Sequence, residues 1–210
     1  MRIGRATLIA CCLAAAALGF AATEPGAPPA PHPAQPSDPP PGDLLIASAQ
    51  IGDPRFYHAV VLLLQHDKDG AVGIVINQPV VEQTIAELLA STGDKDTGVE
   101  GSVMVFKGGP VQTDLGFLIH TAEYHRAETM AVDGKVAMTG SKDALRDIGQ
   151  HKGPRKYLFA LGYTGWGPGQ LEAEIARNDW FTVPEDTALV FDEDRNAIWD
   201  KALARRGQEL

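Results

Sequence analysis

The chain has 210 residues, of which 44% are hydrophobic and 21% are charged, and its formal net charge is −9 at pH 7. This length allows one domain with a sizeable core plus an appendage. An acidic chain without a basic stripe argues against a nucleic-acid partner, because Lys and Arg must neutralise the phosphates.

Residues 1–21 have the layout of a secretory signal peptide. Arg2 and Arg5 precede an apolar run from Ala6 to Phe20, and Gly19-Phe20-Ala21 fits a small-x-Ala cleavage site. We therefore predict export, to the periplasm. Two alternatives stay open: an uncleaved N-terminal membrane anchor, and a lipid anchor at Cys11, although the apolar run before Cys11 is short. Contact with a membrane is expected only through these alternatives.

Residues 22–42 are rich in proline, which predicts an extended, semi-rigid tether. A recognition segment for a polyproline-binding groove is the other interpretation. The two cysteines, Cys11 and Cys12, both lie in the predicted signal peptide. The rest of the chain therefore has no thiolate for a disulfide, a nucleophile or a zinc site.

The globular pattern covers residues 43–210. Short apolar runs bounded by turn residues predict strands at 44–48, 59–64, 71–76, 102–106, 116–120, 129–132, 136–139, 157–162, 180–183 and 188–191. Capping signals and amphipathic spacing predict helices at 84–90, at 142–148, after Pro168 and around 198–203. Because hairpins dominate, we predict an α+β fold with one mixed, largely antiparallel sheet and about four helices.

The stretch from Leu161 to Leu171 has four glycines around Trp166 and leads from a strand into a helix. Glycine is used where φ is positive or where two backbones approach closely, so we predict a tight corner here. Trp166 fits a core anchor and a pocket wall equally well. In the following helix, Glu172 and Glu174 are predicted to face water.

The candidates for catalysis are His66, His120 and Asp53, with Asn77 as a polar side chain that orients them. His66 and His120 both end predicted strands, so they could meet at one rim of the sheet. The His120 to His125 spacing does not match a helical zinc pair, and the Asp-rich turns lack the pattern of a calcium loop. We expect neither a metal nor a cofactor.

Several motifs occur in one order along the chain, and with them it resembles the YqgE/AlgH family over about residues 44–206. The motifs are Asp53-Pro54-x-Phe56, Gly70–Asn77-x-Pro79, Gly108-Gly109-Pro110-Val111, Gly116–His120, Met138-Thr139-x-Ser141-x-Asp143 and Gly162-Tyr163-x-Gly165-Trp166-x-x-Gly169-Gln170-Leu171-Glu172. The resemblance implies a single-domain α+β protein without an established activity, and we do not carry over DNA binding from the regulatory label of the family.

The chain departs from the family in three respects. Gln78 stands where members usually have a basic residue, and Leu115 stands where they usually have arginine. Members also usually lack a leader and are cytoplasmic. If those basic groups bind an anion in the family, this chain has lost or altered that capacity.

These observations favour a binding or regulatory module that recognises a small molecule or a protein partner, and they leave open whether it forms a homo-oligomer. The predicted binding residues are Asn77, Gly108, Gly109, Pro110, Tyr163, Gly165, Trp166, Gly167 and Gly169. The rival hypothesis is an enzyme with an unknown, hydrolase-like reaction at His66, His120 and Asp53.

Overall fold

The computed structural model describes residues 38–94 and 98–206. The predicted signal peptide and residues 22–37 of the predicted tether lie outside the described residues. At the start of the described chain, Pro39 and Gly42 are buried, and the Gly42 N–H donates a hydrogen bond to the Leu63 carbonyl at 2.8 Å. In the described part of the chain, no helix has the length and apolar character needed to cross a membrane.

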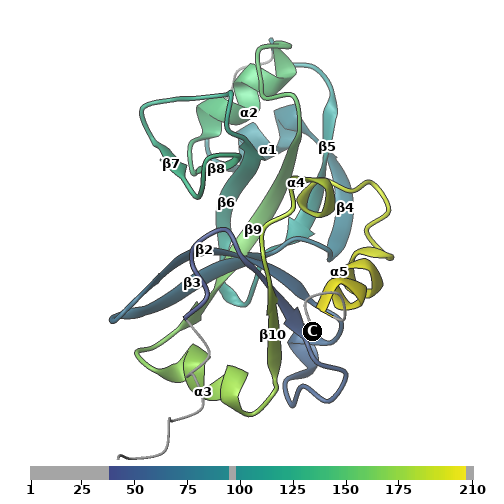
Figure 1. Cartoon of the computed structure of the whole chain (residues 1–210). Coiled ribbons are helices and arrows are strands. Elements are labelled where there is room, and N and C mark those ends of the chain that lie inside the picture. The colour runs from purple at the N-terminus through teal and green to yellow at the C-terminus, as the bar shows by residue number, and fades with distance from the viewer. Residues whose placement is uncertain (1–37, 95–97, 207–210) are drawn as a thin grey trace, which may run out of the picture. The chain divides into compact units, whose positions relative to one another are not determined.

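Ten strands of the described residues form one curled, mixed sheet (Figure 1). They are β1 (Leu44–Ala47), β2 (Val60–Asp67), β3 (Gly70–Val75), β4 (Pro79–Thr84), β5 (Ser102–Lys107), β6 (Val111–Thr121), β7 (Thr129–Ala131), β8 (Val136–Thr139), β9 (Tyr157–Trp166) and β10 (Trp180–Val183). The order is β10-β1-β2-β3-β9-β6-β8-β7; β5 pairs with β9, and β4 pairs with β5. The β5–β9 pair is parallel and the others are antiparallel, which confirms the predicted fold class.

The described α-helices are α1 (Ile85–Ser91), α2 (Lys142–Gly149), α3 (Gln170–Ala176), α4 (Thr187–Val190) and α5 (Ile198–Arg206). The capping box of α1 forms as predicted: the Thr84 hydroxyl accepts from the Glu87 N–H, and the Glu87 carboxylate accepts from the Thr84 N–H, each at 3.2 Å. Ser141 caps α2 by accepting from the Asp143 N–H at 3.3 Å.

One prediction of local structure is wrong, and one strand was missed. Residues 187–190 form α4 rather than a strand, because the Asp186 carboxylate accepts from the Ala188 N–H at 2.7 Å and caps a helix. A short apolar run does not distinguish the two structures by itself. Pro79 begins β4, where no strand was predicted; β4 pairs with β5 alone, so a missing N–H is tolerated.

Strand β9 is the strand that the two halves of the sheet share. Its first half pairs with β5 and β6, and its last residues, from Thr164 to Trp166, pair with β3. Gly162 lies between the halves with φ of +73°. The predicted corner is therefore continuous strand as far as Trp166, and the chain turns only at Gly167–Gly169.

The helices cover the sheet at three places. Helices α1 and α2 lie side by side against β5 and β6, and their buried residues include Leu89 and Leu145 (Figure 1). Helices α4 and α5 pack on β1 and β2 through Val190 and Ile198. Helix α3 packs through Leu171 against the end of β9 and the start of β10, where the candidate site lies.

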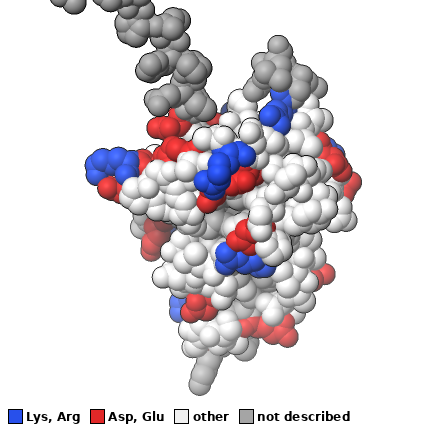
Figure 2. Space-filling view, turned by 90° about the horizontal axis from the view of Figure 1, so that it is seen from below, with Lys and Arg blue, Asp and Glu red and all other residues white. Residues whose placement is uncertain are grey.

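On the face drawn in Figure 2, Lys and Arg side chains occur in small separate groups, mostly beside Asp or Glu. This face shows no continuous basic stripe among the described residues.

Candidate functional site

Glu174 on α3 joins two tryptophans that come from different strands. Its Oε2 atom accepts hydrogen bonds from the indole N–H of Trp166 and of Trp180, each at 2.8 Å, and its Oε1 atom accepts from the Gln170 side chain at 2.9 Å. The two indole rings meet edge to face, with centroids 5.8 Å apart. The prediction that Glu174 faces water is therefore wrong, because helical spacing does not reveal partners on neighbouring strands.

A third aromatic ring comes from the 3₁₀ turn Pro54–Phe56. Phe56 meets Trp180 edge to face at 5.4 Å between centroids. Asp53 caps this turn by accepting from the Arg55 N–H at 3.0 Å, and it forms an ion pair with the Arg55 guanidinium at 2.5 Å. The hydrogen bond from the Arg55 side chain is the main cause that holds the pKa of Asp53 below its ordinary value. The guanidinium also lies 5.9 Å from the centre of the Phe56 ring.

These groups line a pocket of about 360 Å³, which we call the tryptophan pocket and define by Phe56, Trp166, Trp180, Asp53, Arg55, Glu174 and Asp179. Its volume lies in the range of small-molecule sites. Four of the predicted site residues line it: Asp53, Pro110, Gly165 and Trp166. Phe56, Trp180 and Glu174 were missed as site residues, since the local patterns of the turn, the strand and the helix that carry them do not show that they converge.

Gly108 and Gly109 of the first glycine motif contact the backbone of the second motif and are not among the residues that line the tryptophan pocket. A Cβ atom on Gly108 would lie 2.3 Å from the Gly162 carbonyl oxygen, and one on Gly109 would lie 2.2 Å from the Tyr163 carbonyl group. Only glycine permits this backbone approach. Gly108 and Gly109 therefore hold the turn between β5 and β6 against β9, and this places Pro110 at the pocket.

The other predicted binding residues have structural contacts. The Asn77 side chain accepts from the Val60 N–H and donates to the His58 carbonyl, both at 2.9 Å, so it ties the end of β3 to the start of β2. Gly169 adopts φ of +72° immediately before α3. The Gly167 N–H donates to Gln170 at 3.1 Å. Tyr163 packs its ring against Phe117.

Both ring nitrogens of His66 point at acceptors. Nδ1 lies 2.9 Å from the Pro39 carbonyl oxygen, and Nε2 lies 2.9 Å from the Glu172 carboxylate. Both nitrogens must carry a proton to satisfy these partners, so the geometry favours the imidazolium. Burial acts to lower the pKa of His66, but the bonds to Pro39 and Glu172 raise it, and the net pKa is above its ordinary value. Glu172, like Glu174, therefore has a hydrogen-bond partner within the protein, although both were predicted to face water.

His120 has different surroundings. Its Nδ1 lies 3.0 Å from the Thr121 carbonyl oxygen and its Nε2 lies 2.9 Å from the Thr139 hydroxyl, in a fully buried position. Burial is the main cause that lowers the pKa of His120, which favours the neutral ring. Among the described residues, His66, His120 and Asp53 share no hydrogen-bond partner, ion pair or pocket, and no three His, Cys, Asp or Glu residues are grouped as a metal site.

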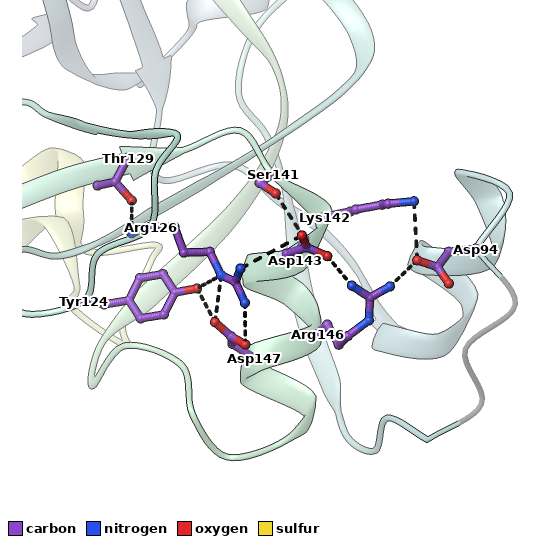
Figure 3. A network of polar contacts seen from close by, with 9 residues as sticks. All are labelled: Asp94, Tyr124, Arg126, Thr129, Ser141, Lys142, Asp143, Arg146 and Asp147. Atoms are coloured by element: carbon purple, nitrogen blue, oxygen red, sulfur yellow. Dashed lines mark hydrogen bonds and ion pairs between the residues drawn. The ribbon is translucent and has the colours of Figure 1, made fainter.

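A separate polar network joins α2 to the loop before β7 and to the end of α1 (Figure 3). The Arg126 guanidinium pairs with Asp147 at 2.7 Å, and the Tyr124 hydroxyl donates to Asp147 at 2.6 Å. On the other side, Arg146 bonds to Asp143 and to Asp94. Burial and the bond to Asp147 raise the pKa of Tyr124 to about 12. The network fixes α2 against its neighbours and lies apart from the tryptophan pocket.

Comparison with known proteins identifies relatives of this chain. A family model described as AlgH-like matches residues 44–210. A UPF0301 protein of Jannaschia sp. (strain CCS1) is 44% identical over 168 residues, which cover 79% of this chain and 88% of that protein. A UPF0301 protein of Thioalkalivibrio sulfidiphilus is 42% identical over 166 residues, or 79% of this chain and 89% of that protein.

Two solved structures share the fold. The solution structure of the AlgH protein from Pseudomonas aeruginosa superimposes with a TM-score of 0.68 at 38% identity, and covers 79% of this chain and 88% of that protein. A crystal structure of a Corynebacterium diphtheriae protein gives a TM-score of 0.62 at 18% identity, over 80% of this chain and 87% of that one; at this identity the likeness concerns the fold alone.

Proposed function

Since this chain belongs to the AlgH-like family of UPF0301 proteins, a membership that by itself assigns no activity, we propose a function from its own geometry: it is a non-catalytic binding module, and the tryptophan pocket receives a small ligand. The observation that carries the proposal is that one carboxylate oxygen of Glu174 accepts both indole N–H groups. This fixes two aromatic side chains from separate strands before any ligand arrives.

A site fixed in advance binds more tightly, because fewer side chains lose conformational freedom on binding. Trp166 is held by the end of β9, Trp180 by the start of β10 and Glu174 by α3. Phe56 adds a third ring from the turn that Asp53 caps. Four separate segments of the chain therefore meet at one small volume of about 360 Å³.

The charge of the lining favours a ligand with a positive or hydrogen-donating group. Three carboxylates, those of Asp53, Glu174 and Asp179, line the pocket with one guanidinium, that of Arg55. Aromatic rings also attract cations, and the position of Arg55 beside the Phe56 ring is an internal example of this contact. We expect small polar amines rather than phosphates or carboxylates.

The histidines support binding over catalysis. A general base needs a ring nitrogen that can take a proton from a substrate. In His66 and His120 both nitrogens are engaged by groups of the protein, and neither residue lines the tryptophan pocket.

The test uses the fluorescence of the pocket tryptophans. The chain has three tryptophans, and Trp199 does not line the pocket, so Trp199→Phe leaves Trp166 and Trp180 as the reporters. This variant is titrated with a set of small amines, amino acids and nucleosides, and thermal unfolding is measured in parallel. A ligand at 100 times its Kd adds about 2.7 kcal/mol of stability, which corresponds to roughly 5–10 °C for a domain of this size.

A matched pair of variants on α3 locates the site. Glu174→Gln removes the charge inside the pocket, whereas Glu172→Gln removes a charge on the same helix that bonds to His66 instead. We expect binding to weaken about tenfold or more in the first variant and to stay unchanged in the second. If no compound changes the fluorescence or the unfolding temperature, the small-ligand proposal is wrong and the pocket is a structural joint.

A further inference from the structure

A second and larger pocket lies between α1, α2 and the strands β6 and β9. Its volume is about 700 Å³, and it shares no lining residue with the tryptophan pocket. We call it the leucine pocket and define it by its large apolar lining residues: Leu88, Leu115, Leu118, Leu145, Leu161 and Phe159. A lining of this kind, with a few polar groups at the rim, is typical of sites for drug-sized ligands.

The rim of the leucine pocket is a bulge in β6. Val111 pairs with Tyr163 and Gly116 pairs with Leu161, so β6 advances five positions while β9 advances two. Residues 112–115 therefore leave the ladder, with Gln112 at φ of +47°. Bulges of this kind redirect side chains and are frequent beside functional sites.

The bulge places an apolar side chain at the edge of the pocket. Leu115 is 45% exposed although it borders a pocket lined by other leucines. At the base of the bulge, a Cβ atom on Gly116 would lie 2.6 Å from the Phe159 ring, so glycine at this position leaves room for the ring in the lining. A ligand in the leucine pocket would bury part of the exposed Leu115 side chain, and removal of this apolar surface from water favours binding.

Some polar side chains at the rim already have a hydrogen-bond or ion-pair partner in the described part of the protein, and others do not. The hydroxyls of Ser91 and Thr92 donate to carbonyls of α1, each at 2.7 Å. The Lys142 ammonium lies 3.4 Å from Asp94. In contrast, the side chains of Gln83 and Asp114 have no hydrogen-bond or ion-pair partner within residues 38–94 and 98–206.

Charge then decides which ligand head group fits. At the same side of the pocket, the cations Arg126, Lys142 and Arg146 form ion pairs with the anions Asp94, Asp143 and Asp147 (Figure 3). Among the described residues that line the pocket, Asp114 is the acidic one, and its carboxylate forms no ion pair with them. A ligand ammonium would supply its counter-charge, whereas a ligand carboxylate would be repelled.

We propose that the leucine pocket binds amphipathic amines. The apolar chain of the ligand lies among the leucines and Phe159, and its ammonium group lies at the rim, where it donates hydrogen bonds to the Asp114 carboxylate and the Gln83 side-chain oxygen. This site is separate from the tryptophan pocket and does not depend on the function proposed there.

The test compares three probes that share one alkyl chain: octylamine, octanol and octanoate. Their affinities for the whole folded protein are measured by isothermal titration calorimetry. We expect octylamine to bind about tenfold more tightly than octanol, and octanoate to bind most weakly. In Asp114→Asn, octylamine should lose this advantage while octanol is unaffected. Equal binding of the three probes, or an unchanged preference in Asp114→Asn, would overturn the proposal.

Exposed residues provide variants that do not put the fold at risk. Leu115→Ser should weaken all three probes, whereas Val80→Ser, which changes a side chain that is 65% exposed on β4 and outside this pocket, should weaken none. Normal octylamine binding in Leu115→Ser would show that the amine binds elsewhere and that the proposal is wrong.

Discussion

The His66 imidazole and the Glu172 carboxylate are bonded at 2.9 Å although 106 residues separate them in the chain. The other ring nitrogen of His66 lies 2.9 Å from the Pro39 carbonyl oxygen. One side chain of β2 therefore connects the beginning of the described chain to α3.

This contact predicts a window of pH for stability. The pKa of His66 is raised from 6.5, so its contribution is complete below 6.5 and is lost as pH rises through the folded pKa. The pKa of Glu172 is lowered from 4.5, through a hydrogen bond to its own backbone and through His66, so its contribution is complete above 4.5 and is lost as pH falls through the folded pKa. Both contributions are complete between those values.

Urea unfolding of the wild type and of Glu172→Gln at several pH values checks this window. We expect the difference in unfolding free energy between the two proteins to be largest between 4.5 and 6.5 and to shrink at alkaline pH. Glu82→Gln, which changes an exposed carboxylate on β4, serves as the control. A difference that grows above neutral pH would show that the bond does not depend on a charged His66.

Replacement of Glu174 tests the junction of α3 with β9 and β10. Glu174→Ala leaves two indole N–H groups without their acceptor on residues that are 7% and 1% exposed, Trp166 and Trp180. We expect a loss of about 2–4 kcal/mol in unfolding free energy, and a smaller loss in Glu174→Gln, whose amide oxygen still accepts. Equal stability of Glu174→Ala and the wild type would mean that the indoles find water as an acceptor.

Replacement of Gly109 tests the contact between the glycine motifs. In Gly109→Ala the new Cβ atom would lie 2.2 Å from the Tyr163 backbone, which cannot move without breaking its pairing with Val111. We expect a loss of about 2–4 kcal/mol, measured by chemical denaturation. Gly134→Ala is the matched control, since a Cβ atom there meets no atom within 4 Å. Similar losses in both variants would contradict the backbone clash.

The titration of Tyr124 tests the network around α2. Because burial and Asp147 raise the pKa of Tyr124 to about 12, this residue should stay protonated when an ordinary tyrosine, of pKa 10.0, has ionised. Tyrosinate absorbance followed against pH in the wild type and in Tyr124→Phe isolates its contribution. Asp147→Asn should lower the pKa of Tyr124, while Glu123→Gln, next to it in sequence, should not.

Local patterns in the sequence were sufficient to predict most of the helices and strands. The capped helix predicted at 84–90 and the neighbouring strands predicted at 59–64 and 71–76 depend on nearby residues in the chain, and the structure confirms them as α1, β2 and β3. Residues 187–190 were assigned wrongly because a short apolar run fits either structure until the Asp186 cap is seen.

The candidate site was only partly predictable, because its contacts are long-range. Trp166 and Pro110 stood out through the unusual glycine motifs around them. The bonds from Trp166 and Trp180 to Glu174 depend on how α3 folds back between β9 and β10, and no spacing within one element reports that. Helical periodicity therefore assigned Glu174 to the solvent.

The pairing of β9 with both halves of the sheet affects how the domain unfolds. It forms backbone hydrogen bonds with β3 in one half of the sheet and with β5 and β6 in the other. If β9 separated from either half of the sheet, backbone N–H and C=O groups that are now paired would lose their partners. The domain should consequently melt in one cooperative step, and the amide protons of β9 should be among the slowest to exchange with deuterium.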